Sequence, residues 1–334
     1  MKAYVLKDIG NIVYEDVPNP VLSAERDVLV KIHASGICSS DIPRVFTNGT
    51  YHFPTIPGHE FSGEIVDTFD GDKNLIGKKV VIFPLLPCNQ CPSCKEKNYA
   101  LCDNYNYFGS RCDGGFAEYI AVPKWNLNII DNKIPYEVAA LMEPSAVALH
   151  AVRKIKVQNV KDILVIGSGT IGILVAFWCK KLFNSNVYIE TRNSFKKTLI
   201  ESIGFFSYDK NACDKNFDAV FECVGSNECV EEAIERSGKG ASIVLVGNPN
   251  SDMKFDKKIY WKILRSEINV IGTWNSDYKN DKDDWKYVSD NMLEDVNFYK
   301  KLITHKFKLH ELEKGLNLIK NREDDFIKVM VENE

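Results

Sequence analysis

The stretch PCNQCPSC, together with a cysteine that follows it, holds four of the ten cysteines of the chain. Four thiolates this close in sequence can complete a tetrahedron around Zn²⁺, and such a closed site leaves no position for a substrate. We therefore predict a structural zinc site that fixes a lobe with little core of its own. An iron–sulfur cluster and unligated thiols are the alternatives. The predicted ligands are Cys88, Cys91, Cys94 and Cys102.

A second, more scattered set of donors suits a catalytic metal. Cys38 lies in GICSSD, and His59 and Glu60 lie together in IPGHEFSGEI. Thiolate, imidazole and carboxylate form an ordinary mixed ligand set for zinc and leave one position open for exchange. Taken singly, each residue also has a simpler explanation: a buried thiol, a hydrogen-bonded core histidine and a solvated charge. Glu143, in MEP, is a further carboxylate that either ligates the metal, directly or through water, or caps the following helix.

A glycine-rich turn, GSGTIG, follows the apolar run DILVI directly and precedes an amphipathic helical stretch. Buried strand, glycine turn, helix and second strand, in that order, are the context in which this motif binds a dinucleotide. The glycines permit a tight turn and close approach of a pyrophosphate, and the helix N-terminus offers free N–H groups. Outside that context the glycines would mark only a tight turn. The residues predicted to bind the dinucleotide here are Gly167, Gly169, Thr170, Ile171 and Gly172.

The end of the second strand, in VYIETRNS, bears on which nicotinamide nucleotide is bound. An acid there typically holds the ribose 2′-hydroxyl of NAD, and Glu190 is one candidate. Counted back from the end of the following helix, however, the strand tip falls on Thr191, with Arg192 next to it. A hydroxyl followed by a cation suits a 2′-phosphate, so the sequence favours NADP(H), with NAD(H) as the alternative. A solvated surface charge is the other explanation for Arg192.

These groups must be positioned by two kinds of scaffold. Residues 1–146 are rich in short β-branched segments separated by glycine and proline, which predicts a mostly antiparallel β domain. Residues 147–274 alternate apolar strands, NVIGTW among them, with helical stretches, which predicts a doubly wound α/β sheet of buried parallel strands. Residues 275–334 read as a charged surface loop, a helix and a final strand. We expect this last part to pack back on the first domain, which would make that domain discontinuous.

The composition argues against several classes of function. The 334 residues are 45% hydrophobic and 26% charged, with a formal net charge of −4 at pH 7. A negative net charge argues against a nucleic-acid partner, and no apolar run reaches the roughly 20 residues that span a bilayer. The N-terminus, MKAYVLKDIGNIVYEDV, reads as a strand pair and not as a signal peptide. We therefore expect a cytoplasmic protein, in which cysteines are thiols or metal ligands.

The ordered set of motifs resembles the zinc-dependent medium-chain dehydrogenase/reductase superfamily over the whole chain. The motifs are GICSSD, PGHEFSGEI, CNQCPSC, GGFAEY, MEP and GSGTIG. Glutamate after the histidine of GHE resembles the polyol dehydrogenase branch. Within it, SDIPR and YFGSRCDGGFAEYI resemble the galactitol-1-phosphate 5-dehydrogenase family, and FECVGS with the Thr-Arg pair resembles the ribitol-5-phosphate dehydrogenases. This resemblance implies a GroES-like catalytic domain (1–146 with 275–334) and a Rossmann domain (147–274).

The resemblance also implies a role for each matching residue. Cys38, His59, Glu60 and Glu143 would form the catalytic zinc site, and the four clustered cysteines would form the structural one. Ser40 matches the family's hydroxyl that contacts the reacting alcohol oxygen and starts the proton relay.

The chain departs from the family pattern beyond that serine. Many relatives have a relay histidine where this chain has Pro43, so we expect the proton to leave through water or the nicotinamide ribose. Arg44 and Arg111 are candidate contacts for a substrate phosphate, although either would also serve as an ordinary structural cation.

Together these features predict an NAD(P)(H)-dependent zinc oxidoreductase. It would interconvert a secondary alcohol of a sugar alcohol phosphate and the corresponding ketose phosphate. An unphosphorylated polyol or a simple secondary alcohol is the alternative substrate, and a non-catalytic zinc- and nucleotide-binding interaction protein is the alternative from another class. The resemblance further implies a homodimer or homotetramer.

Overall fold

The structure is a computed structural model that describes residues 1–156, 159–211, 214–249 and 251–333. The chain divides into two compact units. Unit 1 comprises Met1–Glu143 with Asp277–Glu334, and unit 2 comprises Pro144–Ser276. Each unit is described by itself below.

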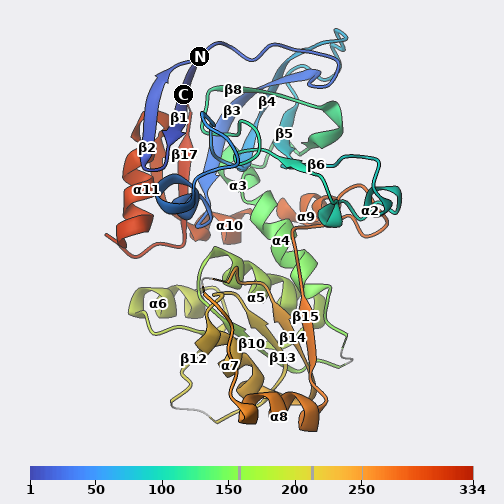
Figure 1. The fold of residues 1–334 in the computed structure, drawn as a ribbon, viewed down its shortest axis with the longest axis vertical. Helices are drawn as coiled ribbons and strands as arrows, with labels where there is room; N and C mark the ends of the chain where they lie inside the picture. The colour runs from blue at the N-terminus through green and yellow to red at the C-terminus, as the bar shows by residue number, and fades with distance from the viewer. Residues whose placement is uncertain (157–158, 212–213, 250, 334) are drawn as a thin grey trace. The chain divides into compact units, whose positions relative to one another are not determined.

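Unit 1 is built on a seven-stranded sheet in which only one neighbouring pair is parallel, so the predicted mostly antiparallel β domain is confirmed. The hairpin predicted at the N-terminus is present as β1 (Lys2–Asp8) and β2 (Asn11–Asp16). The chain's last strand pairs with β3, close to the first strands of the fold (Figure 1). The sheet strands are β16 (Ile303–Lys308), β17 (Lys328–Glu332), β3 (Val28–Ile37), β4 (Glu60–Thr68), β5 (Lys79–Ile82), β9 (Leu127–Ile129) and β8 (Tyr119–Val122).

Short helices and a small hairpin complete unit 1. The hairpin of β6 (Leu85–Leu86) and β7 (Asn106–Tyr107) lies outside the main sheet. Across the described ranges of the whole chain, no helix is both long and apolar enough to cross a membrane. The helices with ends in unit 1 are α1 (Asp41–Pro43), α2 (Pro92–Lys95), α3 (Tyr136–Ala139), α9 (Asp284–Met292), α10 (Val296–Leu302) and α11 (Leu312–Asn321), and α4 (Met142–Val152) begins there.

The segment after residue 275 differs from the predicted surface loop and single helix. Its described residues form three helices, α9, α10 and α11, and the strands β16 and β17. The segment also contributes aromatic rings to the core, because its charged residues alternate with apolar ones that face inward. Tyr278 stacks on Phe83 with ring centroids 4.3 Å apart, and Trp285, fully buried, packs edge-on against Phe83 at 5.4 Å. The Tyr278 hydroxyl donates to the carbonyls of Trp125 (3.1 Å) and Leu127 (2.9 Å).

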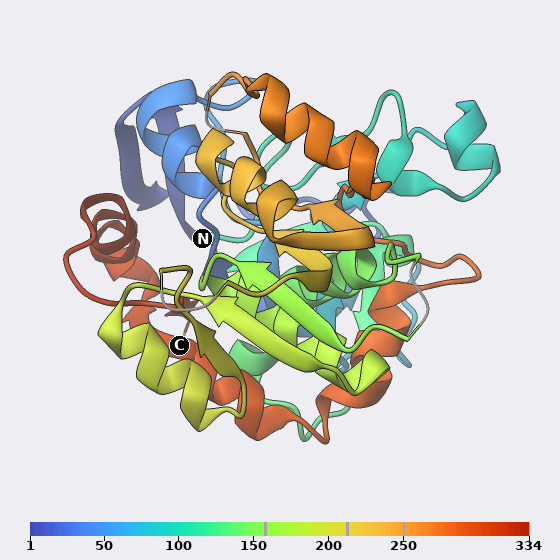
Figure 2. The ribbon, with the colours of Figure 1, turned by 90° about the horizontal axis from the view of Figure 1, so that it is seen from below.

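Unit 2 is a six-stranded parallel sheet in the order β12-β11-β10-β13-β14-β15, the doubly wound topology that was predicted. The order reverses between β10 and β13, and right-handed crossovers in opposite directions place the helices on opposite faces. In Figure 2, α7 and α8 lie on the opposite side of the sheet from α6. The elements are β10 (Asp162–Ile166), α5 (Thr170–Phe183), β11 (Asn186–Glu190), α6 (Ser194–Ser202), β12 (Phe206–Tyr208), β13 (Phe217–Glu222), α7 (Asn227–Arg236), β14 (Ser237–Leu245), α8 (Lys257–Ser266) and β15 (Asn269–Gly272).

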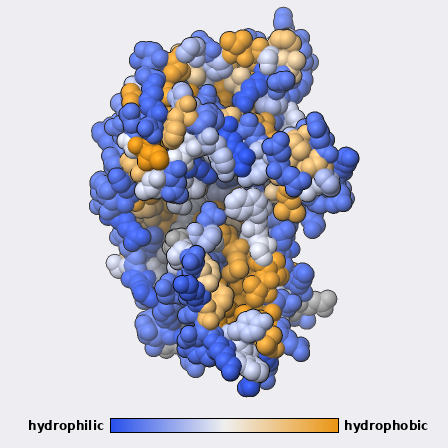
Figure 3. Space-filling view, in the orientation of Figure 1, coloured by the Kyte–Doolittle hydropathy of each residue, from blue (hydrophilic) through white to orange (hydrophobic). Residues whose placement is uncertain are grey.

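The last strand of this sheet contradicts the prediction that all its strands are buried. β15 lies at the sheet edge, and Val270 is 45% exposed. On the helix before it, the large side chains of Tyr260 and Leu264 are 59% and 53% exposed. An apolar area over β15 and α8 is visible on the surface (Figure 3). The apolar sequence therefore marks an uncovered edge and not a central strand.

A substitution in the aromatic cluster tests whether the segment after residue 275 packs in the core of unit 1. Replacing Trp285 with Ala should lower the free energy of unfolding of unit 1 by about 3–5 kcal/mol, because it leaves a cavity under Phe83 and Tyr278. Trp274→Ala is the matched control: this side chain is 51% exposed, and its loss should change stability by less than about 0.5 kcal/mol. Denaturant unfolding curves of both variants would measure the difference. Equal losses of stability in the two variants would contradict the placement of Trp285 in the core of unit 1.

Candidate active site

Strand pairing brings Cys38, His59 and Glu60 together. Cys38 directly follows β3, and His59 directly precedes β4, which begins at Glu60. The two strands are antiparallel, with Gly36 opposite Glu60 in the register, so the end of one meets the start of the other. One donor atom from each of the three side chains lies within 4.8 Å of the others. Sulfur, nitrogen and oxygen donors at this spacing fit a zinc ion.

A buried carboxylate orients the histidine. Asp41 has no exposed surface, and its Oδ1 lies 3.4 Å from Nδ1 of His59. Its Oδ2 accepts a hydrogen bond of 2.9 Å from the backbone N–H of Cys38. Burial by itself would raise the pKa of Asp41, but the neighbouring His59 and Arg44 hold it below its usual value. A carboxylate at Nδ1 fixes the ring and leaves Nε2 as the donor for a metal.

Lys328 provides the counter-charge for Glu60. Lys328 lies on β17, is buried, forms an ion pair with Glu60, and donates a hydrogen bond of 3.1 Å to the carbonyl of Ile37. Burial alone would lower the pKa of this amine, but Glu60 and Cys38 raise it. The pair packs over Gly36, where a Cβ atom would lie only 2.2 Å from Oε2 of Glu60. A side chain at position 36 would therefore displace a predicted ligand.

Glu143 stands next to this group but outside the set of donors within 4.8 Å. It lies in the first turn of α4, 5% exposed, and its Oε1 accepts a hydrogen bond of 3.2 Å from the hydroxyl of Tyr107. The ring of Tyr107 is centred 5.8 Å from that of His59. Burial, together with the charge of Glu60, raises the pKa of Glu143 to about 7. A cation bound by the neighbouring donors would favour the charged form of this carboxyl group.

A helical turn after Cys38 places a hydroxyl and a cation beside the thiol. α1 continues directly into a π-helical turn, η1 (Arg44–Asn48). The hydroxyl of Ser40 donates to Sγ of Cys38 at 3.2 Å. Nη1 of Arg44, four residues later, donates to that hydroxyl at 3.1 Å and to Oδ1 of Asp41 at 3.2 Å. Residues four apart in a helix lie on the same face, which explains why both reach the group.

Arg111, the second predicted phosphate contact, has a different environment. Its guanidinium lies between the rings of Tyr51 and Tyr105, at 4.0 and 4.6 Å from their centroids. The backbone carbonyl of Arg111 lies 3.2 Å from Nε2 of His52. Each of these contacts belongs to the surrounding loops and not to the group around Cys38.

The four clustered cysteines also come together. Their sulfur atoms all lie within 4.8 Å of one another. The backbone N–H of Cys88 donates to Sγ of Cys102 at 3.3 Å, and that of Cys91 donates to Sγ of Cys88 at 3.5 Å. Backbone hydrogen bonds from Gln90 and then Cys91 lower the pKa of Cys88 to about 6. N–H groups directed at sulfur favour the thiolate, the form that binds zinc.

The glycine turn in unit 2 has the shape that a pyrophosphate requires. β10 ends at Ile166, and α5 begins at Thr170. Gly167 has φ of +108°, and a Cβ on Gly172 would lie 1.9 Å from the carbonyl oxygen of Gly167. A Cβ on Gly169 would meet no atom within 4 Å, so the approach to the helix N-terminus is open there. Thr170 and the residue after it supply N–H groups of the first helical turn.

The two candidates for the ribose contact, Glu190 and Thr191, have different surroundings at the end of β11. Glu190 is directed to Lys210, whose Nζ lies 3.8 Å away and which also pairs with Glu232. Thr191 instead lies beside the glycine turn, where its Oγ1 accepts a hydrogen bond of 3.1 Å from the hydroxyl of Ser168. Arg192 is exposed and directly follows it.

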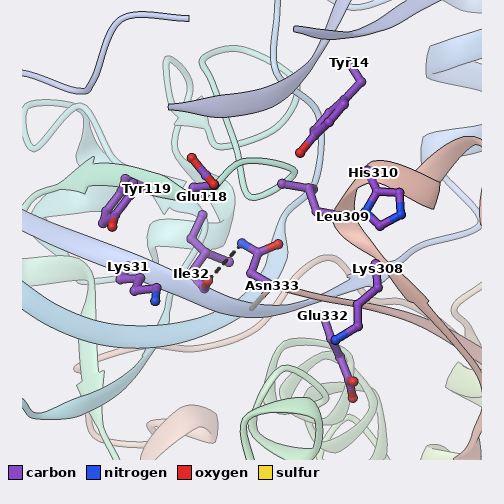
Figure 4. Close-up of a pocket in the computed structure, with 10 residues that line it drawn as sticks. All are labelled: Tyr14, Lys31, Ile32, Glu118, Tyr119, Lys308, Leu309, His310, Glu332 and Asn333. Carbon is purple, nitrogen blue, oxygen red and sulfur yellow. Dashed lines mark hydrogen bonds between the residues drawn. The ribbon is translucent and has the colours of Figure 1, made fainter. Parts of the chain in front are cut away.

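A separate pocket of about 200 Å³ in unit 1 has none of the predicted site residues in its lining. It lies where the end of the chain meets β3, and Asn333 donates to the carbonyl of Ile32 at 2.9 Å (Figure 4). Asn333 also donates to the carbonyl of Ala117 at 2.8 Å. Charged side chains of both signs, including Lys31 and Glu118, line it. The predicted chemistry therefore does not coincide with this hollow.

Sequence reasoning missed three members of the group around Cys38. Lys328 had a usable signal, because a lone cation in the apolar strand FIKVMVE needs a buried partner. Asp41 lies within the GICSSD motif, close to a predicted ligand. Tyr107 had no signal, since an aromatic residue in YNYF reads equally well as core.

Comparison with known proteins agrees with the architecture. The description Alcohol dehydrogenase GroES-like domain matches residues 24–132, and Glucose dehydrogenase C-terminus matches residues 136–333. Galactitol 1-phosphate 5-dehydrogenase of Escherichia coli (strain K12) is 36% identical over 287 residues, covering 82% of this chain and 83% of the relative.

Two solved structures extend the comparison. The crystal structure of galactitol-1-phosphate dehydrogenase from Escherichia coli has a TM-score of 0.91 at 31% identity and covers 99% of this chain and 100% of its own. A zinc-binding dehydrogenase of Sinorhizobium meliloti 1021, solved bound to NADP, has a TM-score of 0.87 at 26% identity and covers 99% and 98%. The chain therefore belongs to the zinc-dependent medium-chain dehydrogenase/reductase superfamily of oxidoreductases, in its polyol dehydrogenase branch.

Proposed function

We propose that the protein interconverts a secondary alcohol of a sugar alcohol phosphate and the corresponding ketose phosphate, with NADP(H) as the hydride carrier. The observation that carries this proposal is the group of Cys38, His59 and Glu60, whose donor atoms lie within 4.8 Å of one another beside the hydroxyl of Ser40. Unit 1 would supply this site, and unit 2 would bind the nucleotide.

The residues around Cys38 would hold a catalytic zinc ion. Cys38, His59 and Glu60 would be its ligands. Glu143, whose pKa responds to the charges of His59 and Glu60, would be a further ligand, either directly or through water. A zinc ion held there would act as a Lewis acid and lower the pKa of a bound hydroxyl group, just as it lowers the pKa of bound water from about 15.7 to roughly 7. The four clustered cysteines would hold a second, structural zinc ion with no open position.

Ser40 would carry the proton away from the substrate. Its oxygen already accepts from Arg44 and has a second lone pair that would accept the proton of the reacting hydroxyl. Ser40 would at the same time give up its own proton, which now points to Sγ of Cys38. Arg44 cannot accept the proton because a guanidinium remains charged, and Pro43 has no titratable side chain. The proton would therefore pass from Ser40 to water or to the nicotinamide ribose.

The phosphorylated substrate is supported by the 36% identity to a galactitol 1-phosphate 5-dehydrogenase. A phosphate needs a cation, and Arg111, held between two tyrosine rings, is the candidate that does not contact the group around Cys38. A hydrogen bond to a charged group contributes about 1.5–3 kcal/mol.

A substrate panel tests this proposal. Galactitol 1-phosphate, ribitol 5-phosphate and sorbitol would each be assayed with NADP⁺ and NAD⁺. We expect kcat/KM for one of the phosphates to exceed that for sorbitol by about 10- to 100-fold, the effect of one such charged contact. Equal or better turnover of sorbitol would contradict the phosphate assignment and favour an unphosphorylated polyol.

NADP(H) is favoured over NAD(H) by the environment of the β11 tip. The carboxylate of Glu190 is engaged with Lys210, and Thr191 takes the place beside the glycine turn. Arg192 adds a positive charge there, with Lys197 exposed in the first turn of α6. A structural relative bound to NADP has the same fold.

Replacing Arg192 with Ala tests the nucleotide preference. We expect the Kd for NADPH to rise about 10-fold or more and the Kd for NADH to change less than about 2-fold, because only NADPH has the 2′-phosphate. Nicotinamide fluorescence titration would measure both constants. A loss of the same size for both nucleotides would contradict a 2′-phosphate contact.

We also propose that the protein is a homo-oligomer of the cytoplasm. The exposed edge strand β15 and the apolar side chains of α8 offer a surface on which a second copy could pair (Figure 3). An uncovered apolar edge strand otherwise favours aggregation.

A charge on this surface tests the oligomer. Val270→Glu combined with Leu264→Glu should convert the wild-type oligomer to monomer, measured by light scattering after size-exclusion chromatography. Lys239→Glu, at an exposed position of β14, is the control and should leave the mass unchanged. A monomeric wild type, or an oligomer that survives both charges, would contradict this interface.

A further inference from the structure

We propose that Arg44 recognises the hydroxyl on the carbon next to the reacting one, and so restricts the enzyme to vicinal diols and α-hydroxy ketones. This inference rests on the proposed function, because it takes Ser40 as the contact of the reacting oxygen. It assigns Arg44 a role different from the phosphate contact expected from the sequence.

The guanidinium is held in a fixed position beside Ser40. Its Nη1 donates to Ser40 Oγ at 3.1 Å and to Asp41 Oδ1 at 3.2 Å, and lies 3.4 Å from Nδ1 of His59. Asp41, which neutralises the charge of Arg44, is fixed in place because it has no exposed surface and accepts a hydrogen bond from the backbone N–H of Cys38. The side chain of Arg44 is 26% exposed, so one part of it remains accessible.

The remaining donors of Arg44 are unused. In the described part of the chain, each hydrogen bond of its guanidinium is made by Nη1, which leaves Nη2 and Nε without a partner. A guanidinium is a rigid planar fork of donors. Nη1 and Nη2 are bonded to the same carbon, so Nη2 lies within one guanidinium width of the atom that donates to Ser40. We infer that it reaches the oxygen next to the one that Ser40 would hold.

Distance along the substrate separates this role from phosphate binding. The name of the Escherichia coli relative puts the phosphate on carbon 1 and the oxidation at carbon 5. A group that is bound to Ser40 cannot reach the far end of such a chain, but it can reach the neighbouring carbon. The oxygen on that carbon is a hydroxyl in both the alcohol and the ketone, and it would accept a hydrogen bond from Arg44 in either state.

The same geometry would exclude alcohols that lack this hydroxyl. A simple secondary alcohol would cover the donors of Arg44 without satisfying them, and a buried unpaired donor is unfavourable. Sites built to hydrogen-bond a substrate hydroxyl can reject the analogue lacking it by about 10⁴-fold. Since Arg44 is partly exposed, we expect a smaller preference, about 100-fold.

The test compares the sugar alcohol phosphate that the wild type oxidises best with its analogue deoxygenated at the carbon next to the reacting one. The wild type should prefer the parent by about 100-fold in kcat/KM. Arg44→Met should lower kcat/KM for the parent by about 100-fold and for the analogue by less than about 5-fold, and Arg44→Lys should restore part of the preference. Arg322→Met, at the exposed end of α11, is the matched control and should change neither value.

A second measurement does not depend on turnover. Nicotinamide fluorescence would give the Kd with which the parent and the analogue each bind to the complex of enzyme and reduced nucleotide. The zinc content and melting temperature of each variant would be measured as well. We expect Arg44→Met to keep its zinc and to bind both alcohols equally. If the variant fails to fold, the wild-type ratio decides: a preference for the parent below about 10-fold would overturn the inference.

Losses of equal size for parent and analogue in Arg44→Met would also overturn it, because Arg44 would then act only through Ser40. This outcome differs from failure of the proposed function. A wild type that oxidises no polyol with either nucleotide would contradict the proposed function and this inference together, whereas turnover without preference would contradict this inference alone.

Discussion

Charges buried around Cys38 and His59 must be neutralised where they lie, because an unpaired buried charge is strongly unfavourable. Two arrangements meet this constraint: Lys328 pairs with Glu60, and Asp41 pairs with Arg44 while accepting from the backbone of Cys38. The Lys328–Glu60 pair joins β17 to β4, whereas the Asp41–Arg44 pair lies within the segment between β3 and β4. The site is thus a compensated network. Asp41 has further partners in His59 and the backbone N–H of Cys38, whereas removal of Lys328 would take the ion-pair partner from the buried Glu60.

This constraint explains why the end of the chain belongs to unit 1. Lys328 reaches Glu60 only because β17 pairs with β3, and the aromatic cluster around Trp285 anchors the segment that leads there. The positions of the metal donors depend on charge compensation, whereas the glycine turn for the nucleotide depends on the shape of the backbone. Gly167 and Gly172 form this turn through close backbone contact and without any charged side chain.

Local sequence patterns were enough to predict the features that are formed by residues close together in the sequence. The cysteine spacing, the glycine turn and helix α5, which runs from Thr170 to Phe183, follow from short-range periodicity and ligand chemistry. Partners that are distant in sequence, such as Lys328 and Tyr107, could not be assigned because strand pairing decides them. The exposure of β15 was missed for a related reason: an apolar run indicates a need for burial but not whether this chain or a second copy supplies it.

The account depends on two metal sites of unequal kind, and zinc content per chain tests it most directly. We expect two zinc ions in the wild type, one in Cys38→Ser with the fold retained, and a loss of stability in Cys91→Ser. The open Cys38 site and the closed four-cysteine site predict this difference. A wild type with one zinc ion, or a Cys38→Ser variant that keeps both, would contradict the assignment of Cys38, His59 and Glu60 as the catalytic site.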